Sequence, residues 1–224
     1  MKAMILAAGL GERMKPLTLH TPKPLLKVAG KHLIEYSIES LVSPGITDIV
    51  INYAHLGEQF PKALGSGDKY GANISYSSED DGPLETAGGI INALPLLGDE
   101  AFIIVNGDIW CDYPFEKLVQ NQKAYESSLC HLVLVSNPEH NEHGDFALDA
   151  GALSEQGEIK CTYSGIGVFH PQLFSGLDVQ TMRLKPLLQK AIDLNKATGE
   201  IYTGDWSDIG TVERLNDLSN RLSC

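Results

Sequence analysis

Residues 3–14 read AMILAAGLGERM, a short apolar run that passes directly into a turn of small residues. The run Ala3–Leu6 predicts a buried strand. The residues with little or no side chain that follow it are Ala7, Ala8, Gly9 and Gly11. They let backbone N–H groups approach a ligand closely, and Arg13 adds a fixed positive charge, so the stretch suits a polyphosphate. A tight strand-to-helix turn without a ligand is the alternative interpretation.

The stretch differs from two familiar phosphate-binding motifs. Met14 stands where the dinucleotide-binding fingerprint has its third glycine, and no acidic residue ends a second strand about 20 residues later. The Gly-Lys-Ser/Thr ending of a Walker A loop is also missing. The predicted phosphate site is therefore of another kind.

Further along the chain, short apolar runs alternate with segments of helical periodicity. The expected strands are Ala3–Leu6, Asp48–Asn52, Ile74–Ser77, Ala101–Asn106, Leu129–Val135 and Gly165–Phe169. The expected helices are His32–Val42, Thr86–Leu94, Pro114–Gln122 and Leu184–Leu194, with one more starting near Val212. Such alternation predicts an α/β fold in which helices cover both faces of a mostly parallel sheet.

Length and composition indicate a single globular domain over residues 1–224. The chain is 43% hydrophobic and 21% charged, with a mean hydropathy of −0.08, which is outside the range of disordered chains. Within the domain, the polar and glycine-punctuated segment 137–165 is expected to be an insert that shapes a substrate pocket. Phe146–Leu148 and Gly157–Ile159 suggest a small antiparallel hairpin in it, and a surface excursion with no role is the alternative.

The charge balance excludes one class of partner. The sequence has 17 Lys and Arg against 29 Asp and Glu, a net charge of −12, and nucleic-acid affinity needs a basic surface. The longest apolar stretches, such as Leu129–Val135, are far shorter than the roughly 20 residues that span a bilayer. No basic leader precedes Gly9, so we expect a cytoplasmic protein without a membrane partner. Four scattered cysteines are expected to be reduced thiols: Cys111, Cys130, Cys161 and Cys224.

Two further motifs suit a phosphorylated ligand. In Thr21–Pro24 the prolines restrain Lys23, which favours a grip on a phosphate, although a rigid surface loop would look the same. In Pro83–Gly89 two glycines stand at a helix start, which suggests that something flat, such as a nucleobase, packs on the backbone. A helix merely capped by Thr86 is the alternative there.

Two aspartates are candidates for a metal site. Asp108 follows the strand Ala101–Asn106, and the carboxyl end of a central parallel strand is where ligands bind in such sheets. Asp208, in Trp206–Thr211, precedes another helix. Two carboxylates that meet over a polyphosphate would hold Mg²⁺ through hard oxygen ligands. Asp208 could instead cap the helix that starts near Val212.

Taken together, the motifs resemble one enzyme family. L-A-A-G-x-G-x-R-M, T-P-K-P-L, P-L-x-T-A-G-G, N-G-D and W-x-D-x-G-T occur in this order over nearly the whole chain. The combination is similar to that of the sugar-phosphate nucleotidyltransferases, which join a sugar 1-phosphate to a nucleoside triphosphate. Within this family, four segments resemble the N-acetylmuramate 1-phosphate uridylyltransferase branch in sequence: Pro83–Ile90, Val105–Tyr113, His131–Pro138 and Gly144–Phe146. The implied fold is a Rossmann-like, GT-A-like three-layer nucleotidyltransferase fold with an open, mostly parallel mixed sheet.

The resemblance also implies roles for individual residues. Nucleotide-binding roles fall on Leu6, Ala7, Ala8, Gly9, Gly11, Arg13, Lys23, Thr86 and Gly88. Sugar-side roles fall on Asn106, Gly144, Tyr163, Ser164 and Gly165. The implied catalytic residues are Arg13, Lys23 and Asp108, and Asp108 and Asp208 match the family's Mg²⁺ ligands. The implied substrates are UTP and a sugar 1-phosphate, whose charged phosphate needs no general base.

Some expectations stay open at this point. Glu85 stands where many similar sequences have glycine, although the N-acetylmuramate branch shares the glutamate. A mannose- or glucose-1-phosphate nucleotidyltransferase that uses GTP or dTTP is the alternative activity. The candidates for a cation near an acidic sugar are Lys185, Arg183, His140 and His143. The C-terminal extensions of relatives are missing, and we expect a monomer or a small homo-oligomer.

Overall fold

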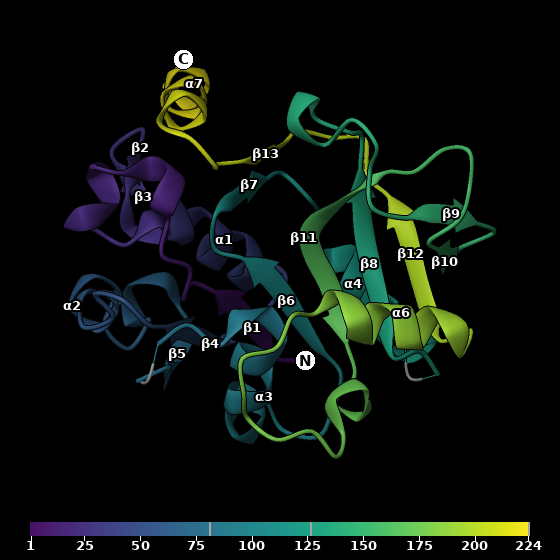
Figure 1. Ribbon diagram of the computed structural model, residues 1–224. Coiled ribbons are helices and arrows are strands. Elements are labelled where there is room, and N and C mark those ends of the chain that lie inside the picture. The colour runs from purple at the N-terminus through teal and green to yellow at the C-terminus, as the bar shows by residue number, and fades with distance from the viewer. Residues whose placement is uncertain (81, 126, 224) are drawn as a thin grey trace.

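The computed structural model describes residues 1–80, 82–125 and 127–223. Within these residues, a nine-stranded mixed sheet has the strand order β5-β4-β1-β6-β11-β8-β12-β10-β9 (Figure 1). Its strands are β1 (Ala3–Leu6), β4 (Asp48–Tyr53), β5 (Asn73–Ser78), β6 (Phe102–Asn106), β8 (Cys130–Val135), β9 (Ala147–Asp149), β10 (Ala152–Ser154), β11 (Thr162–Phe169) and β12 (Ala197–Ile201). Two smaller pairs are β2 (Lys27–Val28) with β3 (Lys31–His32), and β7 (Ile109–Cys111) with β13 (Trp206–Asp208).

Strand direction confirms the predicted open, mostly parallel sheet. β1 is parallel to β4 and to β6, β4 is parallel to β5, and β12 is parallel to β8. β11 runs antiparallel to β6 and β8, and β10 runs antiparallel to β9 and β12. The carboxyl ends of β1, β4 and β6 therefore meet at one edge, which is where ligands bind in open α/β sheets.

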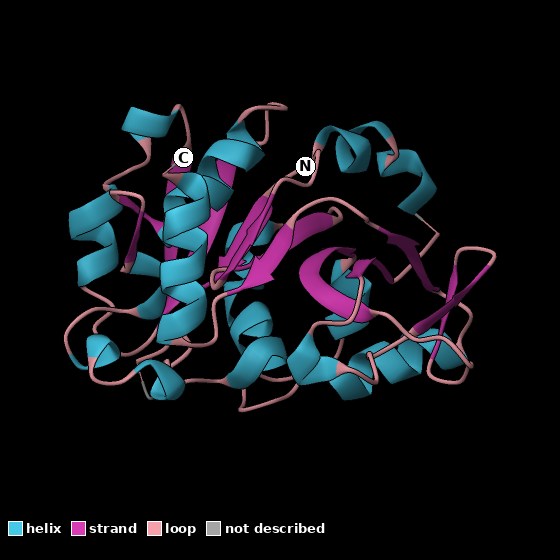
Figure 2. Ribbon diagram, turned by 90° about the horizontal axis from the view of Figure 1, so that it is seen from above, coloured by secondary structure: helices cyan, strands magenta, loops and turns pink. Residues whose placement is uncertain are grey.

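Helices cover both faces of the sheet (Figure 2). One face packs against α1 (Leu33–Val42), α2 (Gln59–Leu64), α4 (Glu116–Gln120) and α5 (Gln122–Tyr125), and the other against α3 (Glu85–Leu97) and α6 (Lys185–Asp193). Strand side chains alternate between the two cores: in β1, Ala3 and Ile5 belong to the first and Met4 to the second. The result is the three-layer arrangement that the sequence predicts.

The C-terminal helix α7 (Val212–Leu222) lies beside the N-terminal pair β2–β3 (Figure 1). A third apolar cluster holds it there: Met14, Leu26, Val28, Leu33, Ile209, Leu215 and Leu218. The Ser219 hydroxyl also accepts a hydrogen bond from the Ala29 N–H at 3.0 Å. This docking brings β13, which directly precedes α7, alongside β7 at the edge of the sheet.

Three local expectations are wrong. The hairpin in the insert pairs β9 with β10 around Ala150 and Gly151, and Gly157–Ile159 is not a strand. The expected helix Pro114–Gln122 is divided into α4 and α5. α3 begins at Glu85 after Leu84, and no side chain caps it, so Thr86 is not a cap.

The described cysteines are free thiols: Cys111, Cys130 and Cys161. Burial raises the pKa of the Cys111 and Cys130 thiols to about 12, which makes both poor nucleophiles. Cys224 lies outside the described residues. Among the helices described, none is long and apolar enough to cross a membrane.

His131 gives the fold an acid-sensitive position. It is buried in β8 beside the Tyr125 ring, and among the described residues its Nε2 atom has no hydrogen-bond partner. Burial lowers its pKa below the usual 6.5, although the negative charge of Glu200 opposes this shift. The unfolded chain therefore binds a proton below pH 6.5 that the folded protein does not bind.

We expect the free energy of unfolding to fall as the pH drops below 6.5. The substitution His131→Phe should flatten this decline, because phenylalanine cannot take up the proton. Urea denaturation between pH 5 and 8 is the measurement, with His55→Asn, an exposed position, as the control. An unchanged slope in His131→Phe would assign the acid sensitivity to other groups.

Candidate active site

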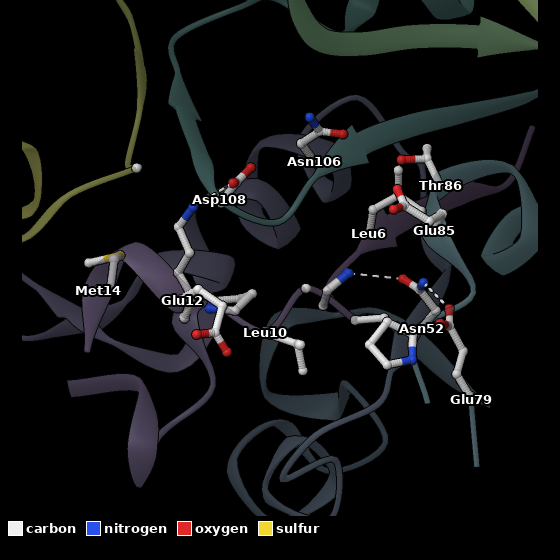
Figure 3. Close-up of a pocket in the computed structure, with 18 of the residues that line it drawn as sticks. Leu6, Leu10, Glu12, Met14, Asn52, Glu79, Glu85, Thr86, Asn106 and Asp108 are labelled. Carbon is white, nitrogen blue, oxygen red and sulfur yellow. Dashed lines mark hydrogen bonds and ion pairs between the residues drawn. The ribbon is translucent and has the colours of Figure 1, made fainter. Parts of the chain in front are cut away.

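A pocket of about 530 Å³ lies at the carboxyl ends of β1, β4 and β6 (Figure 3). Its lining residues are Leu6, Ala7, Ala8, Gly9, Leu10, Gly11, Glu12, Arg13, Met14, Lys23, Pro24, Asn52, Glu79, Pro83, Glu85, Thr86, Asn106, Asp108, Thr181 and Gly210. In Figure 3, Asp108 lies toward one side of the pocket, and Thr86, Asn52 and Glu79 lie toward the other. Ten of the residues proposed from the sequence line it: Leu6, Ala7, Ala8, Gly9, Gly11, Arg13, Lys23, Thr86, Asn106 and Asp108.

Gly11 determines the shape of the loop after β1. Its φ of +63° is in the left-handed region, and a Cβ there would lie 2.8 Å from Thr18 Cγ2. Its carbonyl accepts hydrogen bonds from the Met14 N–H and the Thr18 hydroxyl, both at 2.9 Å. This turn starts the short 3₁₀ helix that carries Arg13. Any larger residue at position 11 would disturb both the backbone and the packing.

Lys23 and Asp108 form an ion pair, with Nζ and Oδ2 2.5 Å apart. The Lys23 side chain is 10% exposed and that of Asp108 is 39% exposed. The prolines hold Lys23 as predicted: it starts a 3₁₀ helix after Pro22, and Pro24 follows inside that helix. Asp108 follows β6 in a turn where the Gly107 N–H donates to the Leu6 carbonyl at 2.8 Å. The pair therefore joins the loop after β1 to the end of β6.

Asp208 is brought to Asp108 by the pairing of β13 with β7. Asp208 is the register partner of Ile109, and the Ile209 N–H donates to the Asp108 carbonyl at 2.7 Å. The Asp208 carboxylate accepts from Arg214 Nη1 at 2.5 Å and lies 3.2 Å from His140 Nε2. Thr211, not Asp208, caps α7, since its hydroxyl accepts from the Arg214 N–H. The capping interpretation of Asp208 is therefore wrong.

The two carboxylates suit Mg²⁺ better than a soft metal. Both are hard oxygen donors, and among the described residues no group of three or more His, Cys, Asp or Glu side chains is arranged to hold a metal. Mg²⁺ is commonly bound by one or two carboxylates, with substrate phosphates as the other ligands. The donors present thus fit Mg²⁺ that arrives with a polyphosphate. Lys23 and Arg214 balance the two negative charges in the structure described.

Two guanidinium groups flank Gly210 at the rim of the pocket. A Cβ on Gly210 would lie 2.3 Å from Arg214 Nη2 and 3.2 Å from Arg13 Nη2. Arg13 comes from the loop after β1 and Arg214 from α7, so distant segments place positive charge together. The sequence offered little sign of Arg214, because its spacing in α7 is that of an ordinary charged helix face.

The start of α3 forms another wall. Glu85 has a φ of +60°, a backbone conformation that glycine adopts at the lowest cost. Gly88 does not line the pocket. The Met182 carbonyl accepts from the Ala87 and Gly88 N–H groups, and a Cβ on Gly88 would lie 2.2 Å from the Gln180 carbonyl oxygen. The segment around Gln180 therefore covers one side of Gly88.

The substitution Gly88→Ala should lower the free energy of unfolding by about 2 kcal/mol, because the methyl group meets a backbone carbonyl that cannot move freely. Helix propensity alone predicts the opposite, a gain of up to about 1 kcal/mol for alanine. Urea denaturation distinguishes the two. Gly9→Ala, where an added Cβ has no atom within 4 Å, is the control and should keep the wild-type midpoint. A Gly88→Ala protein of wild-type stability would contradict the packing described.

The proposed sugar-side residues lie in different surroundings. Asn106 lines the pocket, and Gly165 packs on it, since a Cβ there would lie 2.6 Å from Asn106 Nδ2. Gly165 has a φ of +85° and lies at the irregularity in β11. The Ser164 hydroxyl is buried and donates to the Val133 carbonyl at 2.7 Å. The Tyr163 hydroxyl is also buried, and among the described residues it has no hydrogen-bond partner.

Gly144 lies at the base of the insert, where a Cβ would come within 2.7 Å of the Lys160 carbonyl group. Its neighbour Asp145 accepts from the Tyr163 N–H at 2.8 Å, which ties the insert to β11. Of the candidate cations near an acidic sugar, His140 reaches Asp208, and Arg183 Nε lies 3.8 Å from Glu85. These two interactions place His140 and Arg183 at different sides of the site.

Known proteins resemble the chain over nearly its full length. Residues 2–223 match the family model described as Nucleotidyl transferase. The chain is 49% identical to N-acetylmuramate alpha-1-phosphate uridylyltransferase of Neisseria meningitidis serogroup B, over 97% of this chain and 96% of that enzyme. It is 32% identical to mannose-1-phosphate guanyltransferase of Hypocrea jecorina, over 94% of this chain and 61% of that enzyme. The inositol-1-phosphate CTP transferase structure from T. maritima has the same fold, with a TM-score of 0.78, 18% identity and coverage of 99% and 95%.

Proposed function

The chain belongs to the nucleotidyl transferase family, and on that premise we propose that it joins UTP to N-acetylmuramate α-1-phosphate. The products are UDP-N-acetylmuramate and pyrophosphate. The observation that carries the proposal is the 49% identity, over 97% of the chain, to a uridylyltransferase of this specificity. The alternative, a mannose-1-phosphate guanylyltransferase or a glucose-1-phosphate thymidylyl- or uridylyltransferase, has less support, since the guanyltransferase compared is 32% identical.

The reaction is an in-line displacement at the α-phosphorus of UTP. A phosphate oxygen of the sugar 1-phosphate forms the new P–O bond, and the bond to the β-phosphate oxygen breaks, with its electron pair leaving on pyrophosphate. No general base is needed, because the attacking oxygen is already an anion at neutral pH. The barrier therefore comes from the approach of two anions, and fixed positive charge is what lowers it.

The residues that line the pocket provide that charge and the positioning. The backbone of Leu6–Gly11 and Thr86 lies where it can hold the nucleoside and the triphosphate, and Gly88 would act through the packing of α3. Arg13, which lines the pocket, would face the triphosphate, and Lys23 would face the α-phosphate from beside Asp108. Asn106 and Gly165, in contact with each other, would border the sugar. Gly144, Tyr163 and Ser164 would support this side through the backbone, since the Ser164 and Tyr163 hydroxyls are buried.

Asp108 and Asp208 would hold Mg²⁺ together with the triphosphate, since Asp208 lies on β13 opposite Ile109 of β7 and Asp108 directly precedes β7. When bound, the ion neutralises phosphate charge and polarises the P–O bonds. Lys23 and Arg214 would then exchange their carboxylate partners for substrate phosphate oxygens. We place this reaction in peptidoglycan recycling in the cytoplasm, carried out by a monomer or a small homo-oligomer.

The direct test measures pyrophosphate release from pairs of substrates. We expect UTP with N-acetylmuramate α-1-phosphate to turn over at least about tenfold faster, by kcat/KM, than GTP with mannose 1-phosphate or dTTP with glucose 1-phosphate, a difference of about 1.4 kcal/mol. EDTA should abolish the activity and Mg²⁺ should restore it. Equal or faster turnover of mannose 1-phosphate with GTP would favour the alternative activity.

A further inference from the structure

Asn52 and Glu79 form a buried polar pair in the wall of the pocket that none of the proposed roles includes. They are 3% and 4% exposed, and both line the pocket. Asn52 Nδ2 donates to Glu79 Oε1 at 2.6 Å (Figure 3). Asn52 lies at the carboxyl end of β4, and Glu79 directly follows the neighbouring strand β5. Polar side chains that are buried this deeply in folded proteins are nearly always hydrogen-bonded.

The free ends of the pair hold two separate backbone segments. Asn52 Oδ1 accepts from the Ala7 N–H at 2.9 Å, in the loop after β1. Glu79 Oε2 accepts from the Leu84 N–H at 2.7 Å, in the segment that starts α3. A single chain of hydrogen bonds therefore runs from Ala7 through Asn52 and Glu79 to Leu84. These segments are the two walls between which the proposed nucleotide site lies.

The helix behind the pair is shaped to accept it. A Cβ on Gly89 of α3 would lie 2.5 Å from Glu79 Oε1 and 2.8 Å from Asn52 Nδ2. Only glycine leaves room there, so the pair packs on the α3 backbone and cannot shift toward it. The Glu79 N–H also donates to the Tyr53 carbonyl at 2.9 Å, which holds its backbone to β4. Both side chains are thus fixed from the strand side and from the helix side.

We propose that Asn52 and Glu79 are positioning residues for nucleotide binding, which hold Ala7 and Leu84 so that both walls of the pocket are formed before the nucleotide arrives. This inference rests on the proposed function, since it assumes a nucleotide between these walls. A preformed site binds more tightly because the loops lose no further conformational freedom on binding. The side chains act through the backbone that they hold. An exchange of the amide and the carboxylate between positions 52 and 79 that keeps all three hydrogen bonds should therefore preserve nucleotide binding.

Exchanging the amide and the carboxylate tests the inference. Asn52→Asp places two carboxylates 2.6 Å apart, and Glu79→Gln introduces an amide N–H that must face either Asn52 Nδ2 or the Leu84 N–H. In the double variant, the aspartate accepts from Ala7 and from the glutamine amide, whose oxygen accepts from Leu84. We expect each single substitution to raise the UTP dissociation constant about tenfold or more, and the double variant to return to within about threefold of wild type.

Calorimetric titration with UTP and thermal unfolding, both on the full chain, are the two measurements. Asn73→Asp is the matched control, because Asn73 Nδ2 donates to Asp48 across the same two strands at their exposed ends, 3.1 Å apart. It should leave the UTP dissociation constant unchanged. Asn52→Ala, which adds no charge, is the second variant if a single substitution fails to fold, and it should also bind UTP about tenfold more weakly.

Two results would overturn the inference. One is a double variant with wild-type melting temperature and weak UTP binding, which would mean that the Glu79 carboxylate itself contacts the nucleotide. The other is wild-type UTP affinity in Asn52→Asp or Asn52→Ala. A wild-type protein that binds GTP or dTTP but not UTP would instead refute the proposed substrate, and the same variants would then be compared with the nucleotide that binds.

Discussion

We expect Asp108→Asn to lower the turnover number at least about 100-fold. A bound metal ion stabilises a phosphoryl-transfer transition state by several kcal/mol, and each 1.4 kcal/mol is about a factor of ten. Asparagine keeps the size and an oxygen but removes the negative charge that a metal requires. Stability should change by less than about 1 kcal/mol, because the Asp108 side chain is 39% exposed and its ion pair with Lys23 is screened by solvent.

Steady-state kinetics at saturating UTP, together with thermal unfolding, measure these two effects separately. Asp205→Asn is the matched control, because it removes the carboxylate of another ion pair, 2.8 Å from Arg221 Nη1, that does not line the pocket. Its turnover should stay within about twofold of wild type. Near-normal turnover in Asp108→Asn would remove Asp108 from the metal site, whatever happens to stability.

The regular part of the fold was predictable because its signals are local. The apolar run Ala3–Leu6 and the runs that become β4 and β6 are buried on both faces, so each stands out without knowledge of its neighbours. Asp108 was predictable for the same reason, since a polar residue directly after a buried parallel strand lies at the ligand edge.

Pairings between distant segments were not predictable from local patterns. β7 and β13 are three residues each, and their pairing brings Asp208 to Asp108. The local motifs allowed that juxtaposition as one of two interpretations, and the family resemblance implied it. β12 was not predicted, because Gly199 interrupts its pattern of strand-forming residues. A Cβ at this glycine would lie 2.9 Å from the Leu132 carbonyl oxygen, so the strand packs closely against its neighbour here.

The hairpin in the insert shows how turn chemistry can mislead. Its turn uses Ala150 and Gly151, both with positive φ, as a two-residue turn of the type that favours hairpins. Alanine is uncommon at such a position, and the second strand of the hairpin was therefore predicted at Gly157–Ile159 instead. Asn52 was not predicted as a site residue. It lies next to the last residue of β4, much as Asn106 ends β6, but no glycine follows it to mark a ligand loop.

Lys23→Met should lower turnover about 100-fold and also weaken UTP binding. Lys23 lines the pocket beside Asp108 and its side chain is only 10% exposed, so its charge acts at short range on a phosphate bound there. Methionine keeps the packing of the aliphatic stem and removes only the charge. Lys23→Arg should rescue the variant poorly, because a planar fork cannot take the place of a compact ammonium group between two prolines.

Kinetics and UTP titration of Lys23→Met measure both effects, and Lys31→Met is the control, since Lys31 forms an ion pair of the same 2.5 Å length with Glu39 away from the pocket. The two variants at the ion pair, Lys23→Met and Asp108→Asn, should respond differently to added Mg²⁺, which distinguishes the role of the lysine from that of the aspartate. Lys23→Met keeps both carboxylates as possible metal ligands, so added Mg²⁺ should recover part of its UTP binding, whereas Asp108→Asn should not respond. If Mg²⁺ rescues neither variant or both alike, the lysine acts only by holding Asp108, and its charge does not face the nucleotide.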